Sequence, residues 1–253
     1  MMLRLDKALY LNQNENCLII KKSKGPAMSV ALARPFFLTT IGKKYLMGLT
    51  GLVWAGFVLT HMLGNLLIFV SADAYNKYGH GIVTSGILIP AEIVIVLALL
   101  VHVTMAILLT IENRKAGGGG NRYAMLPNGP KKASLASRTM ALQGSLILAF
   151  IILHIITFKY GQYYETTVNG VQMRDLHRLI VEVFQQPGYV AWYVVCLILL
   201  GFHLSHGVGS IFQSFGMKND HYAPMIKKIS VTYGILVFLG FLSQPLYVYF
   251  FAG

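Results

Sequence analysis

The sequence predicts an all-α membrane protein, a bundle of five transmembrane helices with a cytoplasmic N-terminus and a C-terminus outside. Of its 253 residues, 55% are apolar and only 12% are charged, whereas a soluble domain typically carries about 25% charged residues. Five continuous apolar stretches have about the ~20 residues that a helix needs to cross a bilayer. They cover residues 45–70, 87–111, 139–158, 189–212 and 229–250. These features exclude a soluble globular domain and a disordered chain.

The five stretches read as helices because their apolar runs are continuous and lack the alternation of a barrel strand. Four of them contain no Asp, Glu, Lys or Arg, and the second contains only Glu92. Residues 1–44 and the connections after the second and fourth stretches hold 17 of the 21 Lys and Arg residues. Basic loops stay in the cytoplasm, which orients the bundle and explains most of the net charge of +12 without nucleic acid.

Two domains are expected, a polar cytoplasmic segment over residues 1–42 and the transmembrane domain over residues 43–253. Met28 is an alternative start, and residues 116–134 read as a flexible cytoplasmic loop. In the longest outer connection, Asn169-Gly170 predicts a turn and residues 175–184 predict a short amphipathic helix along the interface. The two cysteines exclude a disulfide framework and a Cys-rich metal site.

Histidines stand inside each of the first four stretches, where an ionisable group is costly and marks a candidate functional site. With a rise of about 1.5 Å per residue, His61 and His154 lie roughly 25 Å from the cytoplasmic edge. By the same measure, His102 and His203 lie roughly 15 Å from that edge. The four side chains therefore form an outer pair and an inner pair. His206, three residues after His203, is an alternative inner ligand on depth alone.

Two imidazoles that face each other from different helices suit the two axial positions of a haem iron. Zinc prefers four protein ligands, or three and a water, and no Cys or carboxylate lies at a matching depth. Two haems held in this way have no open iron position, which favours electron transfer over oxygen chemistry. Gly64, Gly144 and Gly207 give room for a flat macrocycle or for close helix packing.

Polar residues at the helix ends have two interpretations each. Ser137 and Arg138 precede the third stretch, and Lys44 and Tyr45 open the first. They either bind a haem propionate or anchor the helices at the cytoplasmic surface. Glu92, near the outer end of the second stretch, either handles protons for a quinone or is simply exposed at the interface.

At this point the residues resemble a known family, the di-haem cytochrome b membrane anchor of succinate dehydrogenase and fumarate reductase. Residues 201–210 (GFHLSHGVGS) are similar to its fourth helix, and the pattern Ser137-Arg138, Gly144 and His154 resembles its third. The resemblance covers the chain from about residue 43 to residue 250. It implies that His61 and His154 hold an outer haem b, that His102 and His203 hold an inner one, and that His203 is the ligand in preference to His206.

The resemblance also implies partners and a location. A flavoprotein subunit and an iron–sulfur subunit bind on the cytoplasmic side, the flavoprotein carries the succinate site, and this chain exchanges electrons with a quinone. Menaquinone is the quinone that the resemblance suggests, and the bacterial cytoplasmic (inner) membrane is the expected location. The complex can form homo-oligomers, and no nucleic-acid partner is expected.

One position departs from a pattern found in some fumarate reductases. Those proteins place a glutamate two residues before the fourth-helix ligand, and this chain has Gly201 there, which favours succinate dehydrogenase. Two alternatives remain: a cytochrome b anchor of a hydrogenase, formate dehydrogenase or nitrate reductase, and a non-haem transporter whose histidines line a polar path.

Overall fold

The computed structural model describes residues 7–12, 17–22, 35–116 and 138–252. The chain forms two compact units, residues 1–44 and residues 45–253. In the first unit, strands β1 (Lys7–Asn12) and β2 (Cys17–Lys22) pair antiparallel, with Lys7 opposite Lys22. The sequence analysis did not predict this hairpin. Met28 and most of the loop at 116–134 lie outside the described residues.

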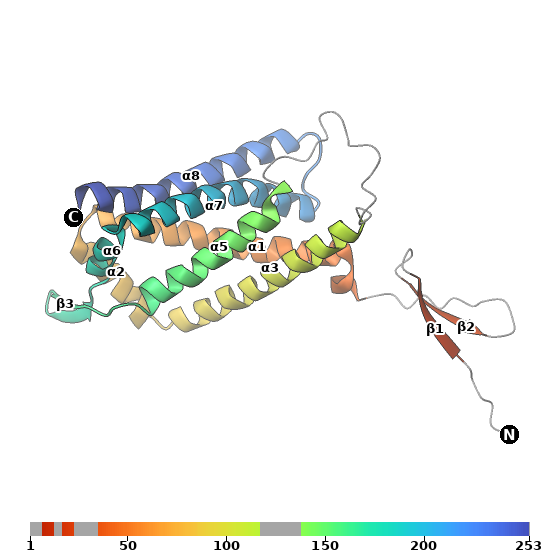
Figure 1. Ribbon diagram of the computed structural model, residues 1–253, viewed down its shortest axis with the longest axis horizontal. Coiled ribbons are helices and arrows are strands. Elements are labelled where there is room, and N and C mark those ends of the chain that lie inside the picture. Colours follow the sequence, from red (N-terminus) through yellow and green to blue (C-terminus); the bar gives the residue numbers. More distant parts are fainter. Residues whose placement is uncertain (1–6, 13–16, 23–34, 117–137, 253) are drawn as a thin grey trace, which may run out of the picture. The chain divides into compact units, whose positions relative to one another are not determined.

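The second unit is a bundle of long apolar helices, of which Figure 1 shows the arrangement. Within the described part of the chain, five helical segments are long and apolar enough to cross a membrane, so the chain is a multi-pass membrane protein, as predicted. They are α1 (Thr40–Asn65) with the 3₁₀ turn η2 (Leu66–Phe69), α3 (Leu88–Ala116), α5 (Met140–His154) with the π-helical turn η3 (Ile155–Lys159), α7 (Pro187–Ser214) and α8 (Ala223–Phe251).

The helix boundaries differ from the prediction by five or more residues at α1, α3 and α8. α1 begins at Thr40, five residues before the predicted start, and α8 begins at Ala223, six residues before it. Each of these two added segments contains a pair of lysines and therefore lies outside the apolar stretch that predicted the helix. The helix nevertheless continues through them, because a proline in the first turn of α8 needs no hydrogen-bond partner there and lysine is a good helix former.

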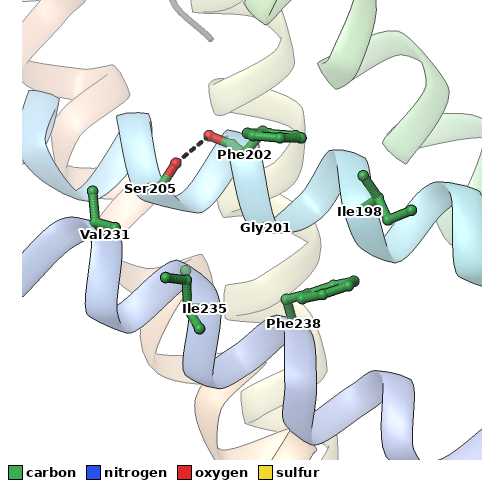
Figure 2. A pocket seen from close by; sticks show the side chains of 8 residues that line it. Ile198, Gly201, Phe202, Ser205, Val231, Ile235 and Phe238 are labelled. Atoms are coloured by element: carbon green, nitrogen blue, oxygen red, sulfur yellow. Dashed lines mark hydrogen bonds between the residues drawn. The ribbon is translucent and has the colours of Figure 1, made fainter.

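α7 and α8 are the most closely packed pair of spanning helices, and glycines permit their approach. A Cβ at Gly234 of α8 would lie 2.7 Å from the carbonyl oxygen of Gly201 and 3.0 Å from the backbone nitrogen of Ser205. Figure 2 shows Gly201 on the face of α7 that meets α8. Beside it lies an apolar groove of about 260 Å³, and the Ser205 hydroxyl in that groove already donates to the carbonyl of Phe202, 2.9 Å away. The groove opens at the bundle surface, where Phe202 and Ile235 are exposed.

An additional layer covers the end of the bundle at which the chain terminates, the predicted outer end. It consists of α2 (Ala72–Thr84), the hairpin of β3 (Glu165–Val168) with β4 (Val171–Arg174), and α6 (Leu176–Phe184). We call these four elements the outer cap. A hydrophobic cluster joins the cap to the spanning helices, and it contains Ile68, Tyr75, Leu179, Val183, Tyr193 and Val248.

The predicted turn and short helix both occur in the outer cap. Asn169 and Gly170 have φ angles of 53° and 79°, which is the left-handed backbone that a two-residue hairpin turn requires. α6 follows, and Asp175 is its N-cap. The Asp175 carboxylate accepts a hydrogen bond from the backbone N–H of Arg178 at 3.0 Å. α2 was not predicted because its sequence ADAYNKYGHGIVT is mixed in polarity; the local signal for it is Ser71, which caps the helix by accepting from the N–H of Ala74 at 3.1 Å.

The close approach of α7 and α8 predicts that Gly234→Ala destabilises the protein. The added methyl group meets backbone atoms that cannot move aside, and overpacking of this kind typically costs about 1–3 kcal/mol. Thermal unfolding of the detergent-solubilised protein measures the effect. Gly56→Ala in α1 is the matched control, because its Cβ would meet nothing within 4 Å and both substitutions change helix propensity equally. Equal melting temperatures for the two variants would contradict the role of Gly234.

The outer cap predicts a dependence of stability on acid pH. The Tyr164 hydroxyl and the Arg178 guanidinium donate to the Glu182 carboxylate at 2.6 and 2.9 Å, and these two hydrogen bonds lower the pKa of Glu182. The folded-state pKa therefore lies below the unfolded value of about 4.3. The resulting stability is present above that pH and is lost as the pH falls through the folded-state pKa.

Thermal unfolding between pH 6 and pH 3 tests this expectation. Glu182→Gln removes the titrating group, so the melting temperature of the variant should fall less steeply with acidification than that of the unsubstituted protein. Parallel curves for the two proteins would show that Glu182 does not contribute.

Candidate functional site

Four histidines from four spanning helices form two pairs inside the bundle. The ring centroids of His61 in α1 and His154 in α5 are 5.8 Å apart. Those of His102 in α3 and His203 in α7 are 6.4 Å apart. The structure therefore pairs the same histidines that were predicted to pair from their depths in the spans.

The spacing of each pair suits a single metal ion between the two rings. A metal–imidazole bond is about 2.0–2.1 Å long and the bonding nitrogen lies about 1.1 Å from the ring centre, so two imidazoles on opposite faces of one metal have centroids about 6 Å apart. Both observed separations are close to this value. Within the described residues, no group of three or more His, Cys, Asp or Glu side chains could hold a metal ion. The donor sets thus fit a cofactor that needs only two axial imidazoles.

In the outer pair, each histidine is held by neighbours that restrict its ring. The Nδ1 atom of His154 lies 2.9 Å from the Tyr193 hydroxyl, and the π-helical turn η3 begins at the next residue. The ring of His61 stacks on Phe57, with centroids 5.3 Å apart and planes 19° apart. A hydrogen bond to one ring nitrogen orients a ligating histidine and leaves the other nitrogen for the metal, which is the arrangement at His154.

In the inner pair, the hydrogen bonds of Thr50 define the state of His102. The Thr50 hydroxyl donates to the carbonyl of Leu46 at 2.8 Å, so its oxygen is an acceptor for the Nδ1–H of His102, 3.2 Å away. This tautomer leaves the Nε2 lone pair of His102 for a metal. The Nδ1 atom of His203 is buried and has no hydrogen-bond partner among the described residues, and such a buried polar atom calls for an explanation.

The glycines near the histidines serve different purposes. A Cβ at Gly144 would lie 3.8 Å from the ring of His203, and a Cβ at Gly51 would lie 3.6 Å from the ring of His102. At Gly51 and Gly144, the absence of a side chain therefore leaves space beside the rings of the inner pair. A Cβ at Gly207 would meet nothing within 4 Å. Gly64 has another role, because a methyl group there would overlap the ring of Tyr78 in α2.

The spacing of the helices also distinguishes the histidine region from the α7–α8 contact. α7 and α8 run within 8 Å of each other, Cα to Cα, over much of their length, whereas α1 stays further than this from the other spans along nearly all of its length. α1 contacts them through side chains, for example through the Tyr233 hydroxyl, which donates to the Ala55 carbonyl at 2.5 Å. The wider spacing around α1 is what a flat macrocycle between helices requires.

The remaining predicted residues are not members of the two pairs. The Nε2 atom of His206 lies 3.2 Å from the Ser210 hydroxyl, one turn further along α7. Arg138 and Lys44 are exposed, and the ring of Tyr45 packs edge-on against Phe215 at 4.8 Å. Ser137 lies outside the described residues. The structure places Arg138 and Tyr45 at the predicted cytoplasmic end of the bundle, without a contact to a histidine pair.

Glu92 forms an ion pair that the sequence analysis did not predict. Its carboxylate accepts from the Lys159 ammonium group, which lies at the end of η3. Both side chains are a little under half exposed. The pair joins α3 to the helix that carries His154, near the outer end of the bundle.

Sequence reasoning missed the side chains that hold the histidines in place. A partial signal existed for two of them. Thr50 lies 11 residues, about three helical turns, before His61, and Asn65 lies four residues after it, so both polar side chains share the histidine's face of an otherwise apolar helix. Tyr193 carries no comparable signal, because its contact with His154 joins different helices.

Fold and site together define a multi-pass α-helical membrane protein with two internal histidine pairs. Comparisons with models of known families, with curated proteins and with solved structures found no match to this chain.

Proposed function

We propose that this chain is the haem-carrying membrane anchor of a succinate dehydrogenase or a fumarate reductase. In this role it relays electrons between an iron–sulfur subunit and a membrane quinone through two bis-histidine b haems. The observation that supports the proposal is that four separate spanning helices bring together two pairs of imidazoles. The ring centroids of each pair are separated by a distance near 6 Å. A histidine that lay in a span by chance would need only one hydrogen-bonding neighbour. It would not need a second histidine at this distance.

Each haem, when bound, supplies an iron that accepts and returns one electron. The chain's own residues do the rest. His61 and His154 bind at the outer position and His102 and His203 at the inner one, while Tyr193 and Thr50 orient two of these rings. The apolar spans exclude water from both positions. Because two histidines would hold each haem, the chain would favour electron relay over the binding of oxygen.

The proposed partners follow from the family resemblance and the charge distribution. The flavoprotein and the iron–sulfur subunit bind at the basic, cytoplasmic end, the flavoprotein carries the succinate site, and the membrane is the bacterial inner membrane. Of the two directions, the proposal favours succinate oxidation. Gly201 is supporting evidence, because a Cβ there would lie 3.1 Å from the Cβ of Phe238 and 3.6 Å from the carbonyl of Gly234. A glutamate at this position would require α8 to move.

At the outer end, the proposal assigns Glu92 to proton exchange with the quinone, with menaquinone as the expected species. The Lys159 ammonium group beside it fixes the position of the carboxylate.

Substitution of the histidines tests the proposal by spectroscopy. We expect the purified chain to contain two b-type haems, each visible in the reduced-minus-oxidised spectrum. His61→Ala and His154→Ala should abolish the same haem signal, and His102→Ala and His203→Ala should abolish the other. Each variant should retain one haem per chain by pyridine haemochrome assay. His206→Ala is the matched control and should retain both.

A colourless preparation contradicts the proposal and favours the transporter alternative. Two haems with a molybdenum or nickel subunit in place of a flavoprotein would assign the chain to an anchor of another respiratory complex. Loss of a haem in His206→Ala with retention in His203→Ala would exchange the assignment of these two residues.

Substitution of Glu92 tests its assignment to proton exchange. General acid–base catalysis contributes typically ~10²–10⁴-fold, so Glu92→Gln should slow quinone turnover by the complete complex at least tenfold. Lys159→Gln breaks the same ion pair but keeps the carboxylate, and it should retain most of the activity. Equal losses in the two variants would show that the ion pair serves only to join the helices.

A further inference from the structure

A chain of hydrogen bonds connects His61 to the outer cap. Asn65 lies one turn after His61, and its Nδ2 atom donates to the backbone carbonyl of His61 at 2.8 Å. The same Nδ2 atom lies 3.5 Å from the Nδ1 atom and 3.4 Å from the Nε2 atom of the His61 ring. The Oδ1 atom of Asn65 accepts from the hydroxyl of Tyr75 in α2 at 2.6 Å. Because the amide nitrogen is the atom that can donate to a carbonyl, the amide oxygen faces Tyr75, and its orientation is defined on both sides.

Tyr75 is fixed in the outer cap. Its side chain is 8% exposed and belongs to the hydrophobic cluster under the cap, and the ring of His177 lies edge-on to it with a centroid separation of 6.5 Å. Burial raises the pKa of Tyr75, so the hydroxyl keeps its proton and remains a donor to Asn65.

The residue after Tyr75 connects α2 to α6. Asn76 is 2% exposed. Its side-chain nitrogen donates to the Asp175 carboxylate at 2.8 Å, and its side-chain oxygen accepts from the backbone N–H of His177 at 3.0 Å. Asp175 is itself the N-cap of α6. The position of Tyr75 therefore depends on the packing of two helices that lie outside the spanning segments.

From this chain of contacts we propose that Tyr75 and Asn65 are positioning residues for His61, through which the outer cap sets the orientation of that imidazole and the properties of the outer haem iron. The proposal rests on the function proposed above. Partners beyond the ligands themselves fix ring orientation and tune a bound metal. The Tyr193 hydroxyl can accept from the Nδ1–H of His154, whereas Asn65 acts on His61 by contact with its ring.

A role in positioning fits the chemistry better than a role in carrying protons. The link between Tyr75 and His61 is a carboxamide, which has no group that titrates near neutral pH. Its contribution is to hold the Asn65 side chain against the ring of His61, and this contact loosens when the Tyr75 hydroxyl no longer holds the amide oxygen.

Tyr75→Phe tests the proposal, because it removes the hydroxyl and keeps the buried ring. Redox titration of the purified chain with both haems, together with low-temperature EPR, measures the midpoint potential and the low-field line of each haem. The haem that His61→Ala abolishes identifies the outer one. We expect Tyr75→Phe to shift the potential and the line of the outer haem and to leave the inner haem unchanged.

Two further variants separate this role from a general effect on the cap. Tyr78→Phe removes the hydroxyl of a tyrosine that lies about one turn after Tyr75 in α2 and is 41% exposed. This substitution should change neither the potential nor the EPR line of either haem. Asn65→Ala should shift the outer haem, and the double variant with Tyr75→Phe should shift it no further, because Tyr75 acts through Asn65.

The outcomes distinguish this inference from the proposed function. Two haems with unchanged potentials and lines in Tyr75→Phe overturn the positioning role and leave the electron relay in place. Equal shifts of both haems, or a shift of the outer haem in Tyr78→Phe as large as in Tyr75→Phe, also overturn it. Absence of haem from the unsubstituted chain overturns both.

Discussion

The lipid environment determines how polar groups are placed in this protein. Hydrocarbon offers no hydrogen bonds, so a polar side chain within a span must find its partner in the protein. Thr50, Tyr193 and Tyr233 each bond across to another helix, while Ile89, Leu97 and Leu236 are exposed on the bundle surface. Among the paired histidines, His102 and His154 follow this rule through Thr50 and Tyr193, whereas the buried Nδ1 atom of His203 has no partner among the described residues.

The outer cap and the histidine pairs depend on each other structurally. The cap packs on the ends of the spanning helices through Ile68, Tyr193 and Val248, and Tyr193 also bonds to His154. On the other side of the outer pair, Asn65 connects His61 to α2. A layer outside the spans thus holds both members of this pair, whereas Thr50 and His102 of the inner pair are held by contacts within the spans.

The sequence predicted the features that depend on composition and on position along a span. Span number, the turn at Asn169-Gly170, the helix at 175–184 and the matched depths of the histidines are such features. It did not predict α2, since the polarity of that helix is mixed and Tyr75 and Asn76 are buried only by contact with distant segments. The Glu92–Lys159 pair and the Tyr193–His154 bond were missed for the same reason: 67 and 39 residues separate the partners, and no local pattern brings them together.

The seam between α7 and α8 has a consequence for how the two cofactor positions would respond to change. His203 belongs to a helix that packs closely against α8 at Gly201 and Gly234. His61 belongs to α1, which contacts the other spans through side chains such as Met62 and is connected to the outer cap through Asn65 and Tyr75. If both positions hold haem as proposed, sequence changes in the exterior segments would alter the outer centre first, because Tyr75 of the outer cap reaches His61 through Asn65.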